Sequence, residues 1–392
     1  MDMSNRLELP QRAGLRERWI GWRNRLLTNP KFQQWSAAFP LTRPIVRSRA
    51  RRAFDLVAGF AYAQVLAACV EGGLLDLLAE GPCDTATAAN RAGLGLAATE
   101  RLLRAAASLG IAESLPGGRW TLGMDGAALQ CNPGARAMIR HHALLYTDLA
   151  DPLALLRADR KEPTALSEFW TYARASATGA VPPGRQGDAD NEPAAAAYSA
   201  LMAASQAMVS EQLVAAYKFS RHKAMLDVGG GTGAFIRAVG MAAPSLRLGL
   251  FDLPDVVAGA EMALDRDALI APRLTFHKGS FLHDPLPSGH DLVTLVRILH
   301  DHDDEPALRI LRAVRAALPP GGTLLIGEPM AGATGGAAMG DAYFGLYLWA
   351  MGSGRPRRPE ELGAMLRSAG FTSWKALPTY LPLVCGAIVA RV

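Results

Sequence analysis

Apolar runs of strand length recur through the second half of the chain, and each ends at a residue suited to binding or catalysis. These runs precede Gly229, Asp252, Gly279, His300 and Glu328, and the segments between them carry the spacing of amphipathic helices. Alternating strands and helices predict an α/β fold with a parallel, doubly wound sheet. Ligands of such sheets bind outside the carboxyl ends of the strands, so we expect the five residues along one edge.

The first of these runs breaks into four glycines within Met225–Phe235, and a helical pattern resumes from Phe235. Glycine is needed where the backbone turns sharply and lies directly against a ligand. The spacing of Gly229, Gly231 and Ala234 also satisfies the dinucleotide fingerprint. The loop therefore predicts a nucleotide-type site without choosing the cofactor.

The second run ends in Asp252-Leu253-Pro254, twenty-one residues after Gly231. A carboxylate at this strand end can accept hydrogen bonds from both hydroxyls of a ribose, which NAD and S-adenosylmethionine share. Asp252 could equally cap the helix that begins at Pro254, and the two roles are compatible. This residue leaves the choice of cofactor open.

Five short motifs in one order resemble the S-adenosylmethionine-dependent O-methyltransferases, which include plant caffeic acid and flavonoid enzymes and bacterial relatives. The motifs are Leu226–Gly233, Phe251–Pro254, Gly279–Phe281, Leu299–Asp304 and Glu328. The resemblance covers roughly residues 55–392. A dehydrogenase would not need the run of histidines and aspartates at His300–Asp304.

The resemblance implies a class I methyltransferase: a Rossmann-like sheet closed by an antiparallel last strand, plus an N-terminal winged-helix dimerisation domain. Phe371–Tyr380 and Leu383–Arg391 would form the closing strands. It implies S-adenosylmethionine as cofactor, a homodimer and no metal. The cofactor-binding residues would be Asp227, Gly229, Gly231, Gly233, Asp252, Leu253, Ser280, Phe281 and Arg297.

The same resemblance assigns the chemistry to three residues. The sulfonium makes the methyl group electrophilic, so the protein must align an oxygen nucleophile and remove its proton. His300 would be the base, since histidine suits that role near neutral pH. Glu328 would orient its ring through the far nitrogen, and Asp301 would be the adjacent supporting acid. The alternative is that His300 only caps a helix.

Three departures from the family pattern bear on this site. His302 stands where Trp is common, and Ser280 replaces an aspartate expected on the adenine side. Pro356-Arg357-Arg358 aligns with a Glu-Arg-Thr run, so a second carboxylate against the base is absent. We expect the base to be less well supported than in phenol-methylating relatives.

The composition bears on the number of hydrophobic cores, on metal or disulfide sites and on the cellular location. The chain has 392 residues, half of them hydrophobic, enough for at least two cores. Its four cysteines include no C-x-x-C pair, so neither zinc nor a disulfide framework is indicated. No unbroken apolar run is long enough to cross a membrane, and the start lacks a signal-peptide pattern. We expect a cytoplasmic protein.

The pattern divides the chain into four parts. Residues 1–53 form an arm, 54–135 a winged-helix domain, 136–220 a helical linker that helps to form the substrate pocket, and 221–392 the cofactor-binding domain. The arm holds twelve Arg or Lys against three acids, net +9, with Trp19, Trp22 and Trp35. Such a segment could contact a membrane peripherally, or could pack on a dimer partner or stay partly disordered. Nucleic acid is not expected as a partner.

Within 54–135, two short helices at Thr85–Asn90 and Ala97–Leu109 precede a hairpin, which is the order of a winged helix. The second helix is too apolar to read a DNA groove convincingly, so dimerisation is the preferred interpretation. A winged-helix regulator that binds S-adenosylmethionine only as a ligand remains an alternative.

By position in the family, the acceptor pocket would be lined from residues 137–178, 195–210 and 330–352. We expect Gly179–Pro193 to be a mobile loop near the entrance of this pocket. The Met and aromatic residues of 330–352 are more typical of core than of a pocket wall, yet few polar groups accompany them. The scarcity of polar groups in this segment favours a large apolar substrate. Overall the chain resembles the carotenoid O-methyltransferases of purple photosynthetic bacteria, which implies methylation of the 1-hydroxyl of an acyclic hydroxycarotenoid. A phenolic, polyketide or tetrapyrrole acceptor is the alternative.

Overall fold

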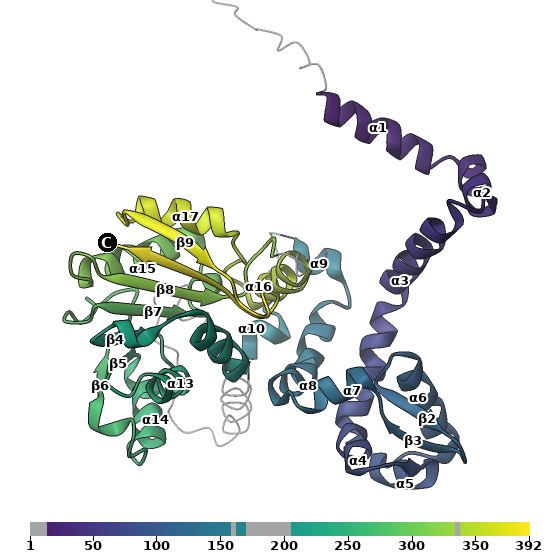
Figure 1. The fold of residues 1–392 in the computed structure, drawn as a ribbon, viewed down its shortest axis with the longest axis horizontal. Coiled ribbons are helices and arrows are strands. Elements are labelled where there is room, and N and C mark those ends of the chain that lie inside the picture. Colours follow the sequence, from purple (N-terminus) through teal and green to yellow (C-terminus); the bar gives the residue numbers. More distant parts are fainter. Residues whose placement is uncertain (1–13, 158–161, 170–204, 334–337) are drawn as a thin grey trace, which may run out of the picture.

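The computed structural model describes residues 14–157, 162–169, 205–333 and 338–392. Figure 1 shows an α/β domain, an N-terminal helical domain beside it and two further helices projecting away from both. The predicted loop Gly179–Pro193, and parts of the predicted pocket segments, lie outside the described residues.

The α/β domain is built on a seven-stranded sheet with the order β6-β5-β4-β7-β8-β10-β9. Its strands are β4 (Ala224–Val228), β5 (Arg247–Asp252), β6 (Leu274–Lys278), β7 (Leu292–Val296), β8 (Thr323–Glu328), β9 (Ser373–Leu377) and β10 (Gly386–Arg391). The last strand, β10, runs antiparallel to both β8 and β9, with Ile388 opposite Ile326. The predicted class I methyltransferase topology is confirmed.

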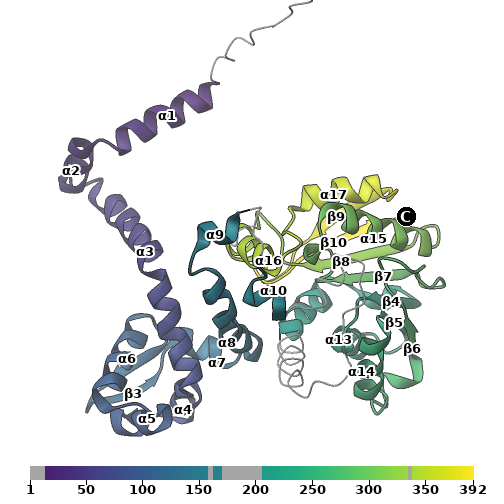
Figure 2. The same ribbon diagram turned by 180° about the vertical axis from the view of Figure 1, so that it is seen from behind.

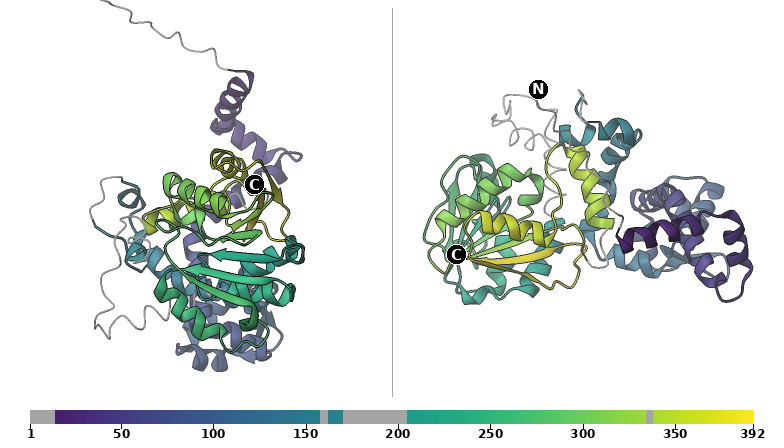
Figure 3. Two further views of the ribbon diagram at one scale, coloured as in Figure 1. Left: turned by 90° about the vertical axis from the view of Figure 1, so that its left-hand side faces the viewer. Right: turned by 90° about the horizontal axis from the view of Figure 1, so that it is seen from above.

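Helices cover both faces of this sheet (Figure 3). One face packs against α13 (Ala234–Ala242), α14 (Pro254–Leu264) and the helical residues 205–216, and the other against α15 (Asp304–Ala317) and α17 (Pro359–Ser368). Because strands β4, β7 and β8 are covered on both sides, they are buried along their whole length and mostly apolar rather than alternating. Each buried leucine or valine contributes about 1.5–3 kcal/mol. This core holds the strand ends, and hence the site, in place.

The N-terminal domain has the predicted winged-helix order. Its elements are α3 (Arg43–Glu71), α4 (Leu74–Glu80), β1 (Cys83–Asp84), α5 (Thr85–Ala92), α6 (Leu96–Ser108), β2 (Ala112–Leu115), β3 (Arg119–Leu122) and α7 (Met124–Gln130). The hairpin pairs Ser114 with Trp120, and the Trp120 indole donates to Thr85 Oγ1 at 3.0 Å. Helix α3 crosses the predicted boundary at residue 53 without a break.

A set of helices lies between the two domains (Figure 2). It comprises α8 (Pro133–Asp148), α9 (Pro152–Leu156), α10 (Ala165–Phe169) and α16 (Gly345–Met351), while η4 (Ala338–Phe344) is a π-helical turn that leads into α16. Two histidine–tyrosine hydrogen bonds join α8 to this later segment: His141 to Tyr347 at 2.8 Å and His142 to Tyr343 at 2.7 Å. Most of α16 is therefore core, as its composition predicts.

The arm comprises α1 (Leu15–Leu27), α2 (Pro30–Ala38) and the first part of α3, and it carries exposed apolar side chains. Helix α3 is long and apolar enough to cross a membrane by length and composition, with 17% of the apolar window buried. The expectation concerned an unbroken apolar run, and the charged Asp55 interrupts the apolar part of this helix.

Candidate active site

The candidate site lies where the strand order reverses, between β4 and β7. Where the connections that follow two neighbouring parallel strands run in opposite directions, a crevice opens at the carboxyl ends of the strands. The glycine loop after β4 and the 3₁₀ turn η3 (Leu299–Asp301) after β7 both lie at this edge. The topology thus brings the predicted cofactor loop and the predicted base together.

The glycine loop is shaped for a ligand. Gly229, Gly231 and Gly233 have φ angles of 72°, 57° and 80°, a region that disfavours other residues. A Cβ on Gly229 would lie 2.3 Å from Ile298 Cδ1, whereas one on Gly231 would meet nothing within 4 Å. Gly229 therefore packs tightly against the neighbouring loop, while Gly231 presents open backbone to the crevice. This cradle fits a nucleotide-type cofactor.

Asp252 ends β5 and braces that loop. Its Oδ2 accepts from the Gly231 amide and its Oδ1 from the Leu253 amide, both at 2.8 Å. Burial raises the pKa of this carboxyl, and the two amides oppose that rise. Each carboxylate oxygen can accept a second hydrogen bond. The pair of oxygens therefore still suits two ribose hydroxyls.

Asp227, in contrast, lies beneath the loop. It is 2% exposed, and Thr294 Oγ1 donates to its Oδ1 at 2.6 Å. Burial raises the pKa of Asp227 to about 7, and the nearby Asp252 adds to the rise. Its position favours support of the loop from below.

Ser280 and Phe281, which the sequence predicts to bind the cofactor, follow β6. The Phe281 ring lies 3.4 Å from the Cβ position of Gly229 and packs edge-on against His302 at 5.7 Å. His302, which stands where Trp is common, thus packs against the predicted cofactor-binding residue Phe281. The Ser280 amide donates to Asp284 Oδ2 at 2.7 Å, so Asp284 holds this turn. Sequence reasoning missed Asp284 because it lies outside the Gly-x-Phe motif.

Arg297 has a positive φ angle of 58°, and no other non-glycine residue in the described part of the chain does. Such a conformation costs about 1–3 kcal/mol and concentrates at functional sites. Its amide donates to Gly327 O, and its guanidinium donates to Ser205 Oγ at 2.8 Å. The turn places a cation beside the predicted base, where it opposes protonation of His300.

His300 and Glu328 meet, but not as predicted. Glu328 Oε2 accepts from the backbone amide of His300 at 3.1 Å, not from its ring. The expectation that Glu328 holds the far ring nitrogen is corrected: η3 turns the backbone toward β8. His300 Nε2 lies 3.2 Å from Asp301 Oδ1, yet neither ring nitrogen makes a hydrogen bond within the described structure.

Burial is the largest cause of the pKa shifts of His300, Glu328 and Asp301. It depresses the pKa of the 2%-exposed His300 well below its usual value, and Arg297, His302 and Arg357 reinforce that effect. It also raises the pKa of Glu328 and of Asp301 to about 7 each. The imidazole is therefore neutral at neutral pH, which is the form a general base requires.

Aromatic side chains face the base from the η4 turn. The Phe344 ring lies edge-on to the His300 ring at 6.3 Å, and Tyr343 packs against Phe344 at 4.9 Å. Burial raises the pKa of Tyr343 above its usual range, so its hydroxyl stays neutral. The surroundings of the base on this side are uncharged and largely apolar.

The segment 353–358, which the sequence did not single out for positioning, packs on the histidine turn. A Cβ on Gly354 would lie 2.1 Å from His300 O and 2.8 Å from Asp301 Cα. Arg357 is fully buried and hydrogen-bonds the same turn. The missed signal is the glycine-proline-arginine composition Gly352–Arg358, which marks a tightly packed loop.

Replacing Gly354 by Ala should lower turnover about 100-fold, because the added Cβ displaces the backbone that carries His300 and small misplacements are costly. Gly352→Ala is the matched control: its φ is also positive, 104°, but its Cβ meets nothing within 4 Å. The control should lose only about 1–2 kcal/mol of stability. Steady-state rates and melting temperatures compare the two, and equal rates would refute the contact.

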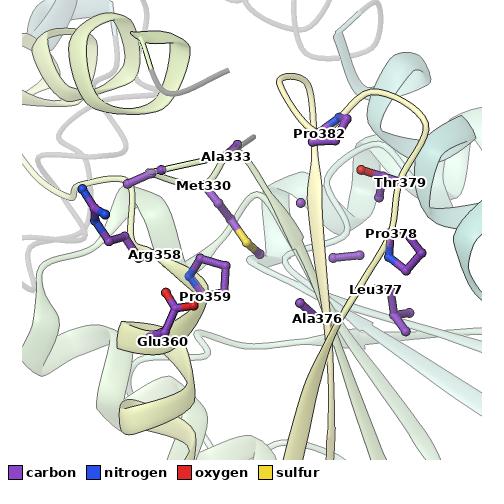
Figure 4. Close-up of a pocket in the computed structure, with 14 residues that line it drawn as sticks. Met330, Ala333, Arg358, Pro359, Glu360, Ala376, Leu377, Pro378, Thr379 and Pro382 are labelled. Carbon is purple, nitrogen blue, oxygen red and sulfur yellow. The ribbon is translucent and has the colours of Figure 1, made fainter. Parts of the chain in front are cut away.

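A cavity of about 320 Å³ opens on the far side of β8, at the edge formed by β9 and β10 (Figure 4). Its lining includes Met330, Arg358, Pro359, Leu377, Pro378 and Thr379. None of the predicted catalytic or cofactor-binding residues lines it, but its lining includes residues 330–333 of the predicted acceptor segment 330–352. The candidate active site is therefore defined by the strand ends and not by this cavity.

Comparison with known proteins agrees with this geometry. An O-methyltransferase domain matches residues 146–372, and an O-methyltransferase dimerisation domain matches residues 54–122. The chain is 39% identical to demethylspheroidene O-methyltransferase from Cereibacter sphaeroides over 98% of this chain and 97% of that protein. It is 40% identical to the Rhodobacter capsulatus protein of the same name, over 95% and 90%.

Among solved structures, human N-acetylserotonin methyltransferase in complex with S-adenosylmethionine superposes with a TM-score of 0.69. It has 25% identity, and the match covers 88% of this chain and 97% of that one. The dimerisation domain includes the exposed apolar residues Phe54, Leu56, Val57 and Phe60 of α3, and so supports a homodimer. The chain belongs to the O-methyltransferase family and is an S-adenosylmethionine-dependent enzyme.

Proposed function

We propose that the enzyme transfers a methyl group from S-adenosylmethionine to the 1-hydroxyl of an acyclic hydroxycarotenoid. The observation that carries the proposal is the neutral, buried His300 at the strand ends, with aromatic side chains against it on the side of the η4 turn. Such surroundings suit a long apolar acceptor with a single hydroxyl. Similarity over nearly the whole chain to proteins that act on demethylspheroidene supports the same acceptor class.

In this mechanism His300 is the general base. Bound S-adenosylmethionine supplies the electrophilic methyl group. A tertiary aliphatic hydroxyl is far less acidic than a phenol, which ionises near pH 10, so His300 does not form a free alkoxide. It accepts the proton as the oxygen attacks, and alignment in a water-poor site contributes much of the rate.

Glu328 and Asp301 act on the base in different ways. Glu328 holds the backbone amide of His300 and so fixes the position of the turn. Asp301 Oδ1 lies 3.2 Å from His300 Nε2, close enough to stabilise the ring once it gains a proton. We assign both as supports of the base.

The cofactor would be held by the residues at the strand ends. Asp252 would accept the ribose hydroxyls, Gly231 would lie against the cofactor, and Leu253, Ser280 and Phe281 would flank the adenine. Gly229, Gly233, Asp227 and Arg297 would shape the loop around them.

Expression in a host that accumulates 1-hydroxylated acyclic carotenoids tests the proposal. The account expects conversion to a pigment heavier by one methylene, with the new group on the 1-oxygen, and no conversion by His300→Ala. Unchanged pigment alongside methylation of added catechols would transfer the function to phenols.

The proposal includes peripheral contact of a cytoplasmic enzyme with a membrane through residues 1–53. The described part of the arm exposes Trp19, Trp22 and Trp35 by 53–56%, among many arginines. Helices α1 and α2 project away from the rest of the molecule (Figures 1 and 2). Tryptophans bury at the lipid interface and arginines favour anionic headgroups. The alignment with the Cereibacter relative leaves only about 2% of this chain outside, so it contains most of the arm.

Trp19→Ala/Trp22→Ala/Trp35→Ala should reduce binding to anionic phospholipid vesicles at least tenfold, because interfacial ring burial is lost while the arm's charge is kept. Co-sedimentation measures it, with Tyr380→Ala, an exposed aromatic outside the arm, as control. Binding to neutral vesicles should be weak, and salt should weaken the anionic binding. Unaltered vesicle binding would contradict the proposed membrane contact. Loss of the dimer in solution would instead indicate that the arm packs on the partner subunit.

A further inference from the structure

Arg357 is a buried cation that no part of the proposed chemistry uses. Its side chain is completely buried, although arginine is almost never fully buried unless paired. The backbone at Arg357 lies beside the residues that come just after β8, since the Ala331 amide donates to Arg357 O at 3.1 Å. Arg357 matches the arginine of the Glu-Arg-Thr run, whereas Pro356 stands where that run has its glutamate.

The guanidinium satisfies its donors on the turn that carries His300. Nη1 donates to Leu299 O and Nη2 to His302 O, both at 2.7 Å. Nε and Nη2 also donate to Asp304 Oδ1, at 2.9 and 2.8 Å. The two carbonyls belong to the residues on either side of the His300–Asp301 pair. A planar fork that bonds both sides of a turn fixes that turn more closely than a single contact.

Neighbouring residues extend the same contact. Ser353 Oγ donates to Asp301 O at 2.9 Å, and the Gly354 amide donates to Asp303 Oδ1 at 3.1 Å. Arg355 donates to both oxygens of Asp304, from Nε to Oδ1 at 3.2 Å and from Nη2 to Oδ2 at 3.1 Å, but its side chain is 42% exposed. Arg357 is thus the buried centre of the contact, and Arg355 lies at its solvent edge.

We infer that Arg357 is a positioning residue for His300: its guanidinium holds the backbone on both sides of the histidine and keeps a fixed positive charge close to the ring. This inference rests on the proposed role of His300 as base. The charges that surround the ring are the cations Arg297 and Arg357, with His302, and the carboxyls of Asp301 and Glu328. Removing Arg357 therefore alters both the geometry and the charge around the base.

Two substitutions separate geometry from charge. Arg357→Gln removes the charge and most of the fork, so kcat should fall about 30–100-fold, by the cost of a misplaced group. Its acid limb should also move to higher pH, because a cation that depresses the His300 pKa is lost. Arg357→Lys keeps the charge but cannot bond both carbonyls in one plane. It should lower kcat while leaving the acid limb near the wild-type position.

Arg355→Gln is the matched control, since it removes an arginine from the same carboxylate at the solvent edge. It should leave kcat and the pH profile near wild type, and cofactor Kd should be unchanged in all three variants. Wild-type kcat in Arg357→Lys would overturn the inference, as would a fall in cofactor affinity equal to the fall in kcat. If Arg357→Gln does not fold, Arg357→Lys alone decides. A fully active His300→Ala would instead refute the proposed base.

Discussion

Replacing His300 by Ala lowers kcat for methyl transfer about 10²–10⁴-fold, the usual contribution of a general base. The cofactor Kd stays close to wild type, because the glycine loop and Asp252 bond each other without the ring. Rapid-quench kinetics and calorimetric titration with S-adenosylmethionine measure the two quantities. The depressed pKa of His300 also places the ring's own contribution to the acid limb below pH 6.5, whereas Asp301 and Glu328, whose pKa values burial raises to about 7, titrate above it.

His277→Ala is the control for this variant, because it removes a histidine from β6, an edge strand that β5 and β4 separate from β7. It should retain wild-type turnover. Equal losses of turnover and cofactor affinity in His300→Ala would show instead that His300 supports the fold of the turn.

Replacing Asp252 by Asn raises the cofactor Kd about 100-fold or more. Hydrogen bonds to a charged group contribute about 1.5–3 kcal/mol each, and the proposed carboxylate makes two to the ribose. The amide also keeps only one accepting oxygen, so either the Gly231 or the Leu253 amide loses its partner. Titration with S-adenosylhomocysteine isolates the effect from turnover.

Asp255→Asn provides the matched comparison three residues further, at an exposed position in the first turn of α14. It changes net charge equally and should leave Kd unchanged. A wild-type Kd in Asp252→Asn would remove the carboxylate from the cofactor site and leave it only its role as a brace of the glycine loop.

The fold could be predicted from the sequence because its signals are local. Buried parallel strands are continuous apolar runs, and each is followed by a glycine or a polar residue at its carboxyl end. The residues at these ends, from Gly229 to Glu328, consequently share one sheet edge. The winged-helix order and the antiparallel β10 were likewise predictable from segment order and resemblance.

The contacts within the site were not predictable in the same way. Whether Glu328 meets the ring or the amide of His300 depends on how the η3 turn is oriented, and residue spacing carries no information on that. Arg357 lies 57 residues beyond His300, and only the folded loop shows that it is buried against the histidine turn. Long-range packing of this kind leaves only a weak sign in a single sequence.

Methyl transfer from radiolabelled S-adenosylmethionine into a detergent-dispersed panel of 1-hydroxycarotenoids, flavonoids and catechols tests the central proposal most directly. The account predicts label on the 1-oxygen of the acyclic carotenoids, abolished in His300→Ala, with little label in the phenols. Label confined to the phenols would contradict the proposed acceptor, and cofactor binding with no label in any acceptor would contradict the proposed reaction.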